Sequence, residues 1–172
     1  MKKTLFVAFS LSLGFSSTVV VSNVASGAST DIAIVDSSGD LYNGYVSIGY
    51  FDSESDVTGA TSISGLASAF NQFGSTLEMN SQLGSAGFFD FGSSPFSGVT
   101  ITGSAFSGQS VYTIISDNSD LSQATSLAVW VSDSSSFTDD SVALGSGATP
   151  NITLISSRRL ICLLYTSDAA DD

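Results

Sequence analysis

The chain has 172 residues, of which 16 are acidic, 4 are basic and none is histidine, so its formal net charge at pH 7 is −12. The four cations are Lys2, Lys3, Arg158 and Arg159, so no salt bridge can form within residues 29–157, which carry 13 carboxylates. This inventory disfavours binding to nucleic acids and to anionic membranes, because both rely on basic side chains. It also excludes Ser-His-Asp and Cys-His catalysis and typical zinc sites, which need imidazole or several thiolates.

The first 28 residues have the three parts of a secretory leader. Lys2 and Lys3 precede an apolar stretch from Leu5 to Phe15, and small residues follow as far as Ala28. A membrane anchor is the alternative, but serines interrupt the stretch, which is shorter than the roughly 20 apolar residues of a spanning helix. We therefore predict a signal peptide over residues 1–28, cleaved after Ala28, and an exported protein of the cell envelope or extracellular space.

The other end of the chain has an unusual sequence. The segment from Cys162 to Asp172 resembles one reading frame of an adapter used to tag sequencing libraries, as found at the ends of truncated metagenomic genes. On this resemblance, residues 158–172 are expected to be a non-native tail that packs poorly from Arg158 onward. The alternative is an ordinary short apolar strand followed by an acidic tail. The predicted organisation is thus a leader, a single β-rich exported domain over residues 29–157, and a tail.

The body of the chain is rich in Ser, Thr and Gly with scattered aromatic residues, a composition that favours short strands joined by polar turns. The predicted strands cover residues 31–35, 42–51, 86–91, 99–102, 110–116, 127–132 and 151–155. Polarity alternates between Tyr45 and Tyr50, which predicts one buried and one solvent-facing side for that strand. The pattern predicts a mainly β fold, an antiparallel β-sandwich or jelly-roll.

One helix is expected, over about residues 61–73. Apolar side chains recur there at helical spacing (Ile63, Leu66, Ala67, Phe70 and Phe73). Thr61 or Ser62 is placed to cap its start, and Gly74 is placed to end it. We predict an amphipathic helix packed on the sheet, and a helix that binds a partner is the alternative.

Acidic clusters are the remaining source of site chemistry. Asp52, Glu54 and Asp56 alternate with serines, and a turn that carries them could wrap a calcium ion with oxygen ligands. The segment lacks the central glycine and the late glutamate of an EF-hand loop, so a solvated turn is the alternative. Asp117 with Asp120 and Asp139 with Asp140 are weaker candidates. No cofactor other than calcium is suggested.

Two further activities can be weighed against the sequence. A glycosidase needs two carboxylates across a cleft, for which Glu54 and Glu78 can be nominated, but nothing singles out one pair, so we predict no enzymatic activity. Carbohydrate binding needs exposed aromatic platforms, and Trp130, Tyr112, Tyr45 and Tyr50 are the candidates. Trp130 lies in an apolar run over residues 127–131, which is more typical of a buried strand than of a binding platform.

From Tyr42 on, three stretches carry a resemblance to a known group: Phe70-Asn71-Gln72-Phe73-Gly74, the run from Phe106 to Asn118, and the run from Leu121 to Trp130. They resemble small exported proteins, common in planctomycete and verrucomicrobial genomes, that end in a PEP-CTERM sorting signal. The resemblance implies an exosortase-handled envelope or extracellular protein with no assigned activity. The sorting signal itself is absent from this sequence, and on the adapter interpretation the coding sequence was cut at about Ser157.

The sequence as a whole predicts an exported, non-enzymatic cell-surface or extracellular-matrix protein of unknown ligand. Its partner is unknown, and polysaccharide or matrix material is one candidate class. We expect no nucleic-acid partner, and contact with a membrane only through a missing C-terminal sorting segment. The first alternative is a carbohydrate- or calcium-binding β-sandwich module. The second is a secreted hydrolase that uses paired carboxylates.

Overall fold

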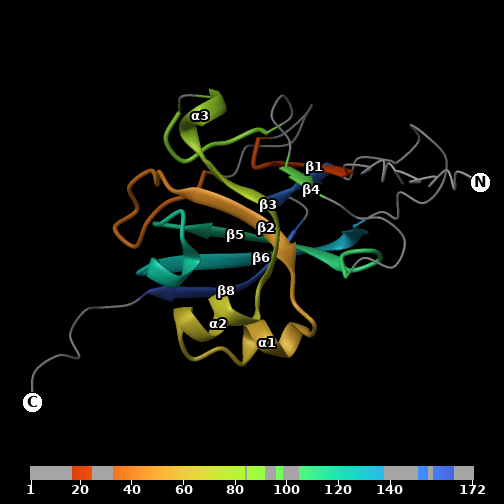
Figure 1. Ribbon diagram of the computed structural model, residues 1–172. Coiled ribbons are helices and arrows are strands. Elements are labelled where there is room, and N and C mark those ends of the chain that lie inside the picture. Colours follow the sequence, from red (N-terminus) through yellow and green to blue (C-terminus); the bar gives the residue numbers. More distant parts are fainter. Residues whose placement is uncertain are drawn as a thin grey trace, which may run out of the picture.

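The computed structural model describes residues 17–24, 33–83, 85–91, 96–98, 105–137, 151–154 and 157–164. Its elements in chain order are β1 (Ser17–Ser22), β2 (Tyr45–Tyr50), α1 (Glu54–Thr58), α2 (Ile63–Ala69), β3 (Asn71–Glu78), α3 (Asn80–Leu83), β4 (Phe96–Gly98), β5 (Ser110–Ser116), the 3-10 turn η1 (Leu121–Gln123), β6 (Ser126–Ser136), β7 (Asn151–Thr153) and β8 (Arg158–Leu164). Figure 1 shows strands through the middle of the molecule, with α1 and α2 below them. The predicted mainly β class is confirmed.

The larger sheet has five strands in the order β3-β2-β5-β6-β8, and every neighbouring pair is antiparallel. Its central strand β5 has the bounds that the sequence predicts. Both sides of β5 are buried, because Val111 and Ile115 point into one apolar cluster while Tyr112 and Ile114 point into another. This sheet is therefore a middle layer with a core on each face.

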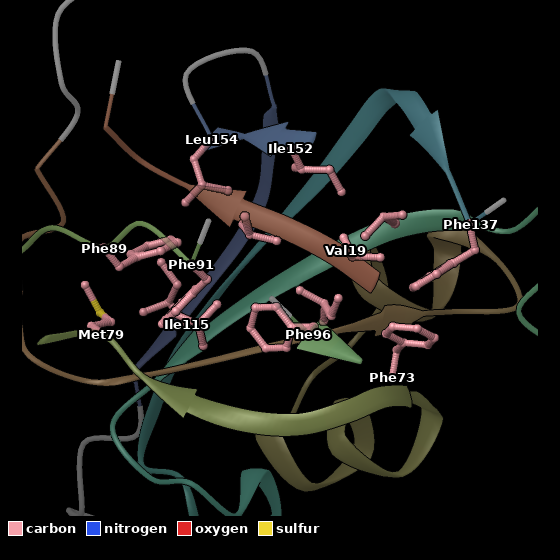
Figure 2. Packing of buried hydrophobic residues seen from close by; sticks show 14 of the residues in the cluster. Val19, Phe73, Met79, Phe89, Phe91, Phe96, Ile115, Phe137, Ile152 and Leu154 are labelled. Atoms are coloured by element: carbon pink, nitrogen blue, oxygen red, sulfur yellow. The ribbon is translucent and has the colours of Figure 1, made fainter. Parts of the chain in front are cut away.

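The smaller sheet has the order β4-β1-β7. β1 pairs antiparallel with β4 and parallel with β7, so this sheet is mixed rather than antiparallel throughout. Its side chains and those of the larger sheet meet in the main core, part of which is labelled in Figure 2 (Val19, Phe73, Met79, Phe89, Phe91, Phe96, Ile115, Phe137, Ile152 and Leu154). Two sheets with apolar side chains between them are compatible with the predicted sandwich.

The second core lies between the larger sheet and the helices. Val57 of α1 and Ile63 and Leu66 of α2 pack there against Phe51, Tyr112 and the inward side chains of β6. The predicted solvent-facing side of β2 is wrong, since Ser47 is fully buried and its hydroxyl lies 2.9 Å from Thr76 Oγ1. The alternation of polarity is present, but a further layer covers the polar side.

The predicted helix over residues 61–73 is too long and is not the only one. Ser62 does cap α2, with its Oγ accepting the Gly65 N–H at 3.1 Å, but the helix ends at Ala69, and Phe70 is extended. Residues from Asn71 on pair with β2 instead of continuing the helix. Gly74 lies inside β3 with φ +70°, where the β2–β3 register shifts, so it forms a bulge rather than a helix end.

The expectation that the chain packs poorly from Arg158 onward is wrong for residues 158–164. These residues form β8, which pairs with β6 from Ser126 to Val131. Leu160 and Ile161 pack against the second core. The physical reason is that β6 would otherwise present an unpaired edge, and backbone pairing at such an edge needs only a nearby segment that can extend.

The fold also extends past the predicted domain at its start, because β1 comes from the predicted leader. Two other predicted strands are present only as single bridges, Val35 with Leu41 and Asp90 with Ser22. The predicted strand over 99–102 lies outside the described residues. Within the described ranges, no helix has the length and apolar character needed to cross a membrane.

Candidate functional site

A shallow hollow of about 420 Å³ opens beside α2 and is the candidate binding site. Its walls come from the end of α2, strand β3 and the loop that carries η1 (Ala67, Ser68, Phe70, Gln72, Thr76 and residues 119–122). The volume lies within the range of sites that hold small ligands. Phe70 supplies an aromatic wall, and it is held in place by Phe51, whose ring centroid lies 5.1 Å away.

Hydrogen bonds fix the polar groups around this hollow. The side chain of Gln72 is exposed, and its Nε2 donates a hydrogen bond to Thr76 Oγ1 at 3.1 Å. This bond fixes the orientation of the Gln72 amide. On the opposite wall, Asp120 Oδ1 accepts the Ser122 N–H at 2.9 Å and the Ser122 hydroxyl at 2.7 Å. The hollow therefore combines hydroxyl, amide and carboxylate groups with one aromatic ring.

Asp120 is the only charged side chain among the described residues that line the hollow. The hydrogen bonds from the Ser122 hydroxyl and backbone N–H lower the pKa of Asp120, so it is an ionised acceptor at neutral pH. A ligand with many hydroxyl donors and no negative charge suits such a surface, because an anion would be repelled by Asp120.

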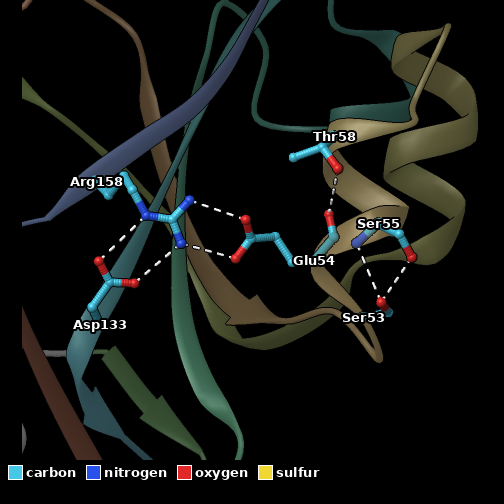
Figure 3. Close-up of polar contacts among 6 residues, drawn as sticks. All are labelled: Ser53, Glu54, Ser55, Thr58, Asp133 and Arg158. Atoms are coloured by element: carbon cyan, nitrogen blue, oxygen red, sulfur yellow. Dashed lines mark hydrogen bonds and ion pairs between the residues drawn. The ribbon is translucent and has the colours of Figure 1, made fainter.

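A second cluster of charged groups lies where β8, β6 and α1 meet (Figure 3). Arg158 donates through Nη1 and Nη2 to the two carboxylate oxygens of Glu54, at 3.0 and 2.8 Å. It also donates through Nε and Nη2 to Asp133, at 3.3 and 3.2 Å. Since all three side chains are exposed, this cluster is a surface clasp that fastens β8 to α1 rather than a buried site.

The clasp and a helix cap separate the three residues of the calcium hypothesis. Glu54 faces Arg158, whose hydrogen bonds lower the pKa of Glu54. Asp56 instead accepts the Ser53 N–H at 3.0 Å as part of the capping box of α1. Asp52 is exposed. In the described part of the chain, no three Asp, Glu, His or Cys side chains are grouped so as to hold a metal ion, so the geometry lends the calcium hypothesis no support.

The nominated hydrolase pair is not brought together. Glu78 pairs with Tyr45 at one end of β2, while Glu54 follows the other end, at Tyr50. The strand between them, at about 3.3 Å per residue, separates them by more than the roughly 10 Å that paired catalytic carboxylates span. The lowered pKa of Glu54 is also the opposite of what a general acid needs.

The weaker acidic candidates have local roles where they are described. Asp117 Oδ1 accepts the Thr125 N–H at 2.9 Å, and its Oδ2 accepts the Thr125 hydroxyl. Burial raises the pKa of Asp117, but the bonds from the Thr125 hydroxyl and from backbone N–H groups outweigh it, so the pKa is lowered overall. Asp139 and Asp140 lie outside the described residues.

The four aromatic candidates do not form an exposed platform. Tyr50 and Tyr112 are buried, at 6% and 5% exposure, and their rings pack edge-on against Phe106 and Phe51. Trp130 is half-buried against the main core, and Tyr45 is also half-buried. The aromatic ring that does line a hollow, Phe70, was assigned to the helix core by the sequence pattern. Its signal is its place directly after a helix, before the polar strand residues Gln72 and Thr76.

No family model matches the chain, and neither a curated protein nor a solved structure is found to resemble it.

Proposed function

We propose that this chain is an exported, non-enzymatic protein of the cell surface or extracellular matrix. The non-enzymatic part of this proposal is supported by the structural roles of the carboxylates. Asp36 accepts the N–H groups of Ser38 and Asp40 in a turn, at 2.8 and 3.0 Å, and the caps and loops described above occupy Asp56, Asp117 and Asp120 in the same way. Carboxylates with these partners stabilise loops and helix starts, whereas a hydrolase needs two that face each other.

Export rests on the leader-like start of the sequence. The resemblance to PEP-CTERM proteins supports a longer natural form that an exosortase would handle at the cell envelope. The direct test expresses the complete chain with a C-terminal tag in a Gram-negative host and separates cytoplasm, periplasm and medium. Recovery of processed protein outside the cytoplasm supports the proposal, and retention of unprocessed protein in the cytoplasm contradicts it.

The non-enzymatic part is tested on the same purified protein. We expect no turnover on a broad panel of neutral and acidic polysaccharides. Turnover that disappears when one carboxylate is changed to its amide, with folding retained, would instead establish the hydrolase alternative.

A second candidate function, binding of a neutral sugar, is favoured by the hollow beside α2. Its amide, hydroxyl and carboxylate groups can accept and donate hydrogen bonds to sugar hydroxyls, while the ring of Phe70 offers an apolar patch to C–H groups. Since β1 and β8 belong to the fold, the binding protein should include both strands rather than residues 29–157 alone.

The test is a titration of the ¹⁵N-labelled chain with neutral oligosaccharides, followed by NMR. Sugar binding predicts shifts confined to residues around Gln72 and Asp120, and their loss in Gln72→Ala. Gln109→Ala is the matched control, because this half-buried glutamine lies away from the hollow. A parallel titration with calcium chloride examines Asp52, Glu54 and Asp56. Absence of shifts with every sugar removes the carbohydrate candidate, and absence of shifts with calcium removes the metal candidate.

A further inference from the structure

Strand β1 is the central strand of the smaller sheet, although its residues come from the predicted leader. Ser17 to Val19 pair with β4, and Val20 to Ser22 pair with β7. Val19 and Val21 are 1% and 0% exposed and lie within the main core, as Figure 2 shows for Val19. The strand therefore contributes both backbone pairing and apolar packing.

The residues that follow β1 are bound as firmly. Asn23 is fully buried, its Nδ2 donates to the Gly87 carbonyl at 2.8 Å, and its Oδ1 accepts the Phe89 N–H at 2.7 Å. The backbone adds bonds from Asn23 N–H to Phe89 O and from Phe91 N–H to Val21 O, each of 3.1 Å. This buried amide is a structural element, because its loss would remove the side-chain acceptor of the Phe89 N–H and leave the Gly87 carbonyl with the bond from the Ile34 N–H.

Cleavage after Ala28 would remove all of these contacts. β4 and β7 would lose their common neighbour, and the core side chains Phe89, Phe91 and Phe96 would lose the valines that cover them. An exported domain stabilised without disulfides depends on that apolar burial. The contacts of β1 and Asn23 therefore favour a mature chain that keeps residues 17–24.

We propose that the export cleavage falls after Ser16, directly before β1. This inference rests on the proposed export of the chain. The bond between Ser16 and Ser17 follows small residues at the first and third positions before it, Ser16 and Gly14, as the bond after Ala28 does with Ala28 and Ser26. The leader over residues 1–16 keeps the basic start and the whole apolar stretch from Leu5 to Phe15, within the usual dimensions of such leaders.

The step is a hydrolysis by a membrane-bound leader peptidase of the host. One water is consumed as the Ser16–Ser17 amide breaks, which leaves a carboxylate on Ser16 and a free amine on Ser17. The apolar leader then separates from a domain in which β1 begins at the new amine. The domain keeps every contact of β1 and Asn23.

The experiment uses the complete chain in an exporting host and determines the N-terminus of the processed product by intact mass and terminal sequencing. Ser16→Gln and Ala28→Gln are the matched variants, because each places the same larger polar residue directly before one of the two candidate bonds. We expect a product that begins at Ser17, most of which is lost in Ser16→Gln, with processing unchanged in Ala28→Gln.

A product that begins at Ser29, lost in Ala28→Gln and unaffected by Ser16→Gln, overturns the inference while leaving export intact. An unprocessed chain that stays in the cytoplasm, in the unaltered protein and in both variants, contradicts the proposed export itself.

Discussion

Arg158 forms a two-pronged ion pair with Glu54, a residue 104 positions earlier in the chain, with N–O distances of 3.0 and 2.8 Å. The pair joins β8 at the edge of the larger sheet to the first turn of α1, and Asp133 on β6 shares the same guanidinium. Arg158 thus lies between carboxylates that would otherwise repel each other.

Removal of the cation should destabilise the protein slightly and in a salt-dependent way. We expect Arg158→Gln to lower the Tm modestly in 0.1 M sodium chloride, because Glu54 and Asp133 then face each other without a counter-charge. The deficit should shrink at 1 M salt, where the screening length falls from about 10 Å to about 3 Å. Differential scanning calorimetry measures both values. Arg159→Gln is the control, and an equal effect of the two variants would contradict a specific clasp.

Truncation of Leu66, a fully buried residue of α2, should strongly destabilise the second core. Leu66→Ala should lower the free energy of unfolding by about 2–5 kcal/mol, the usual range for a buried leucine. The same substitution at Leu41, which is 53% exposed, should cost less than about 1 kcal/mol. Urea denaturation of the three proteins provides the comparison. Similar losses at the two sites would mean that α2 does not pack on the sheet as described.

Asn23 offers a test of the polar contacts beside β1. Asn23→Ala removes the side-chain acceptor of the Phe89 N–H and one of the two donors to the Gly87 carbonyl, at a cost of about 1–3 kcal/mol. The matched change Asn118→Ala removes only an exposed hydrogen bond to the Asp120 N–H, so its cost should be within about 0.5 kcal/mol. Chemical denaturation measures both. A neutral Asn23→Ala would show that residues 17–24 are not part of the folded domain.

The hydrogen bonds of Asp117 should make the folded state less stable in acid. Its pKa is below the ordinary value of 3.8, so its hydrogen bonds stabilise the folded state fully above that pH. This contribution disappears as the pH falls through the lower folded-state pKa. NMR titration of the carboxylate should show the lowered pKa, and Thr125→Val should raise it by removing the hydroxyl donor. A carboxylate that titrates at or above 3.8 in the unaltered protein would contradict the geometry.

The features that the sequence alone determined are those governed by neighbouring residues. Residues 110–116 were predicted as a strand with the bounds observed for β5, because strand propensity and the turn residues around a strand belong to the local sequence. Ser62, one of the two residues predicted to cap the helix, is the observed cap, since a short polar side chain reaches the backbone three residues away.

Only the tertiary structure decided the features that depend on distant partners. The pattern from Ile63 to Phe73 fits a helix, yet the chain leaves it after Ala69 because the edge of β2 offers backbone hydrogen-bond partners from Asn71 onward. The hollow requires α2, β3 and η1 to meet, and the clasp requires Glu54 to meet Arg158. Such contacts arise from the packing of segments far apart in the chain, which local propensity and periodicity do not encode.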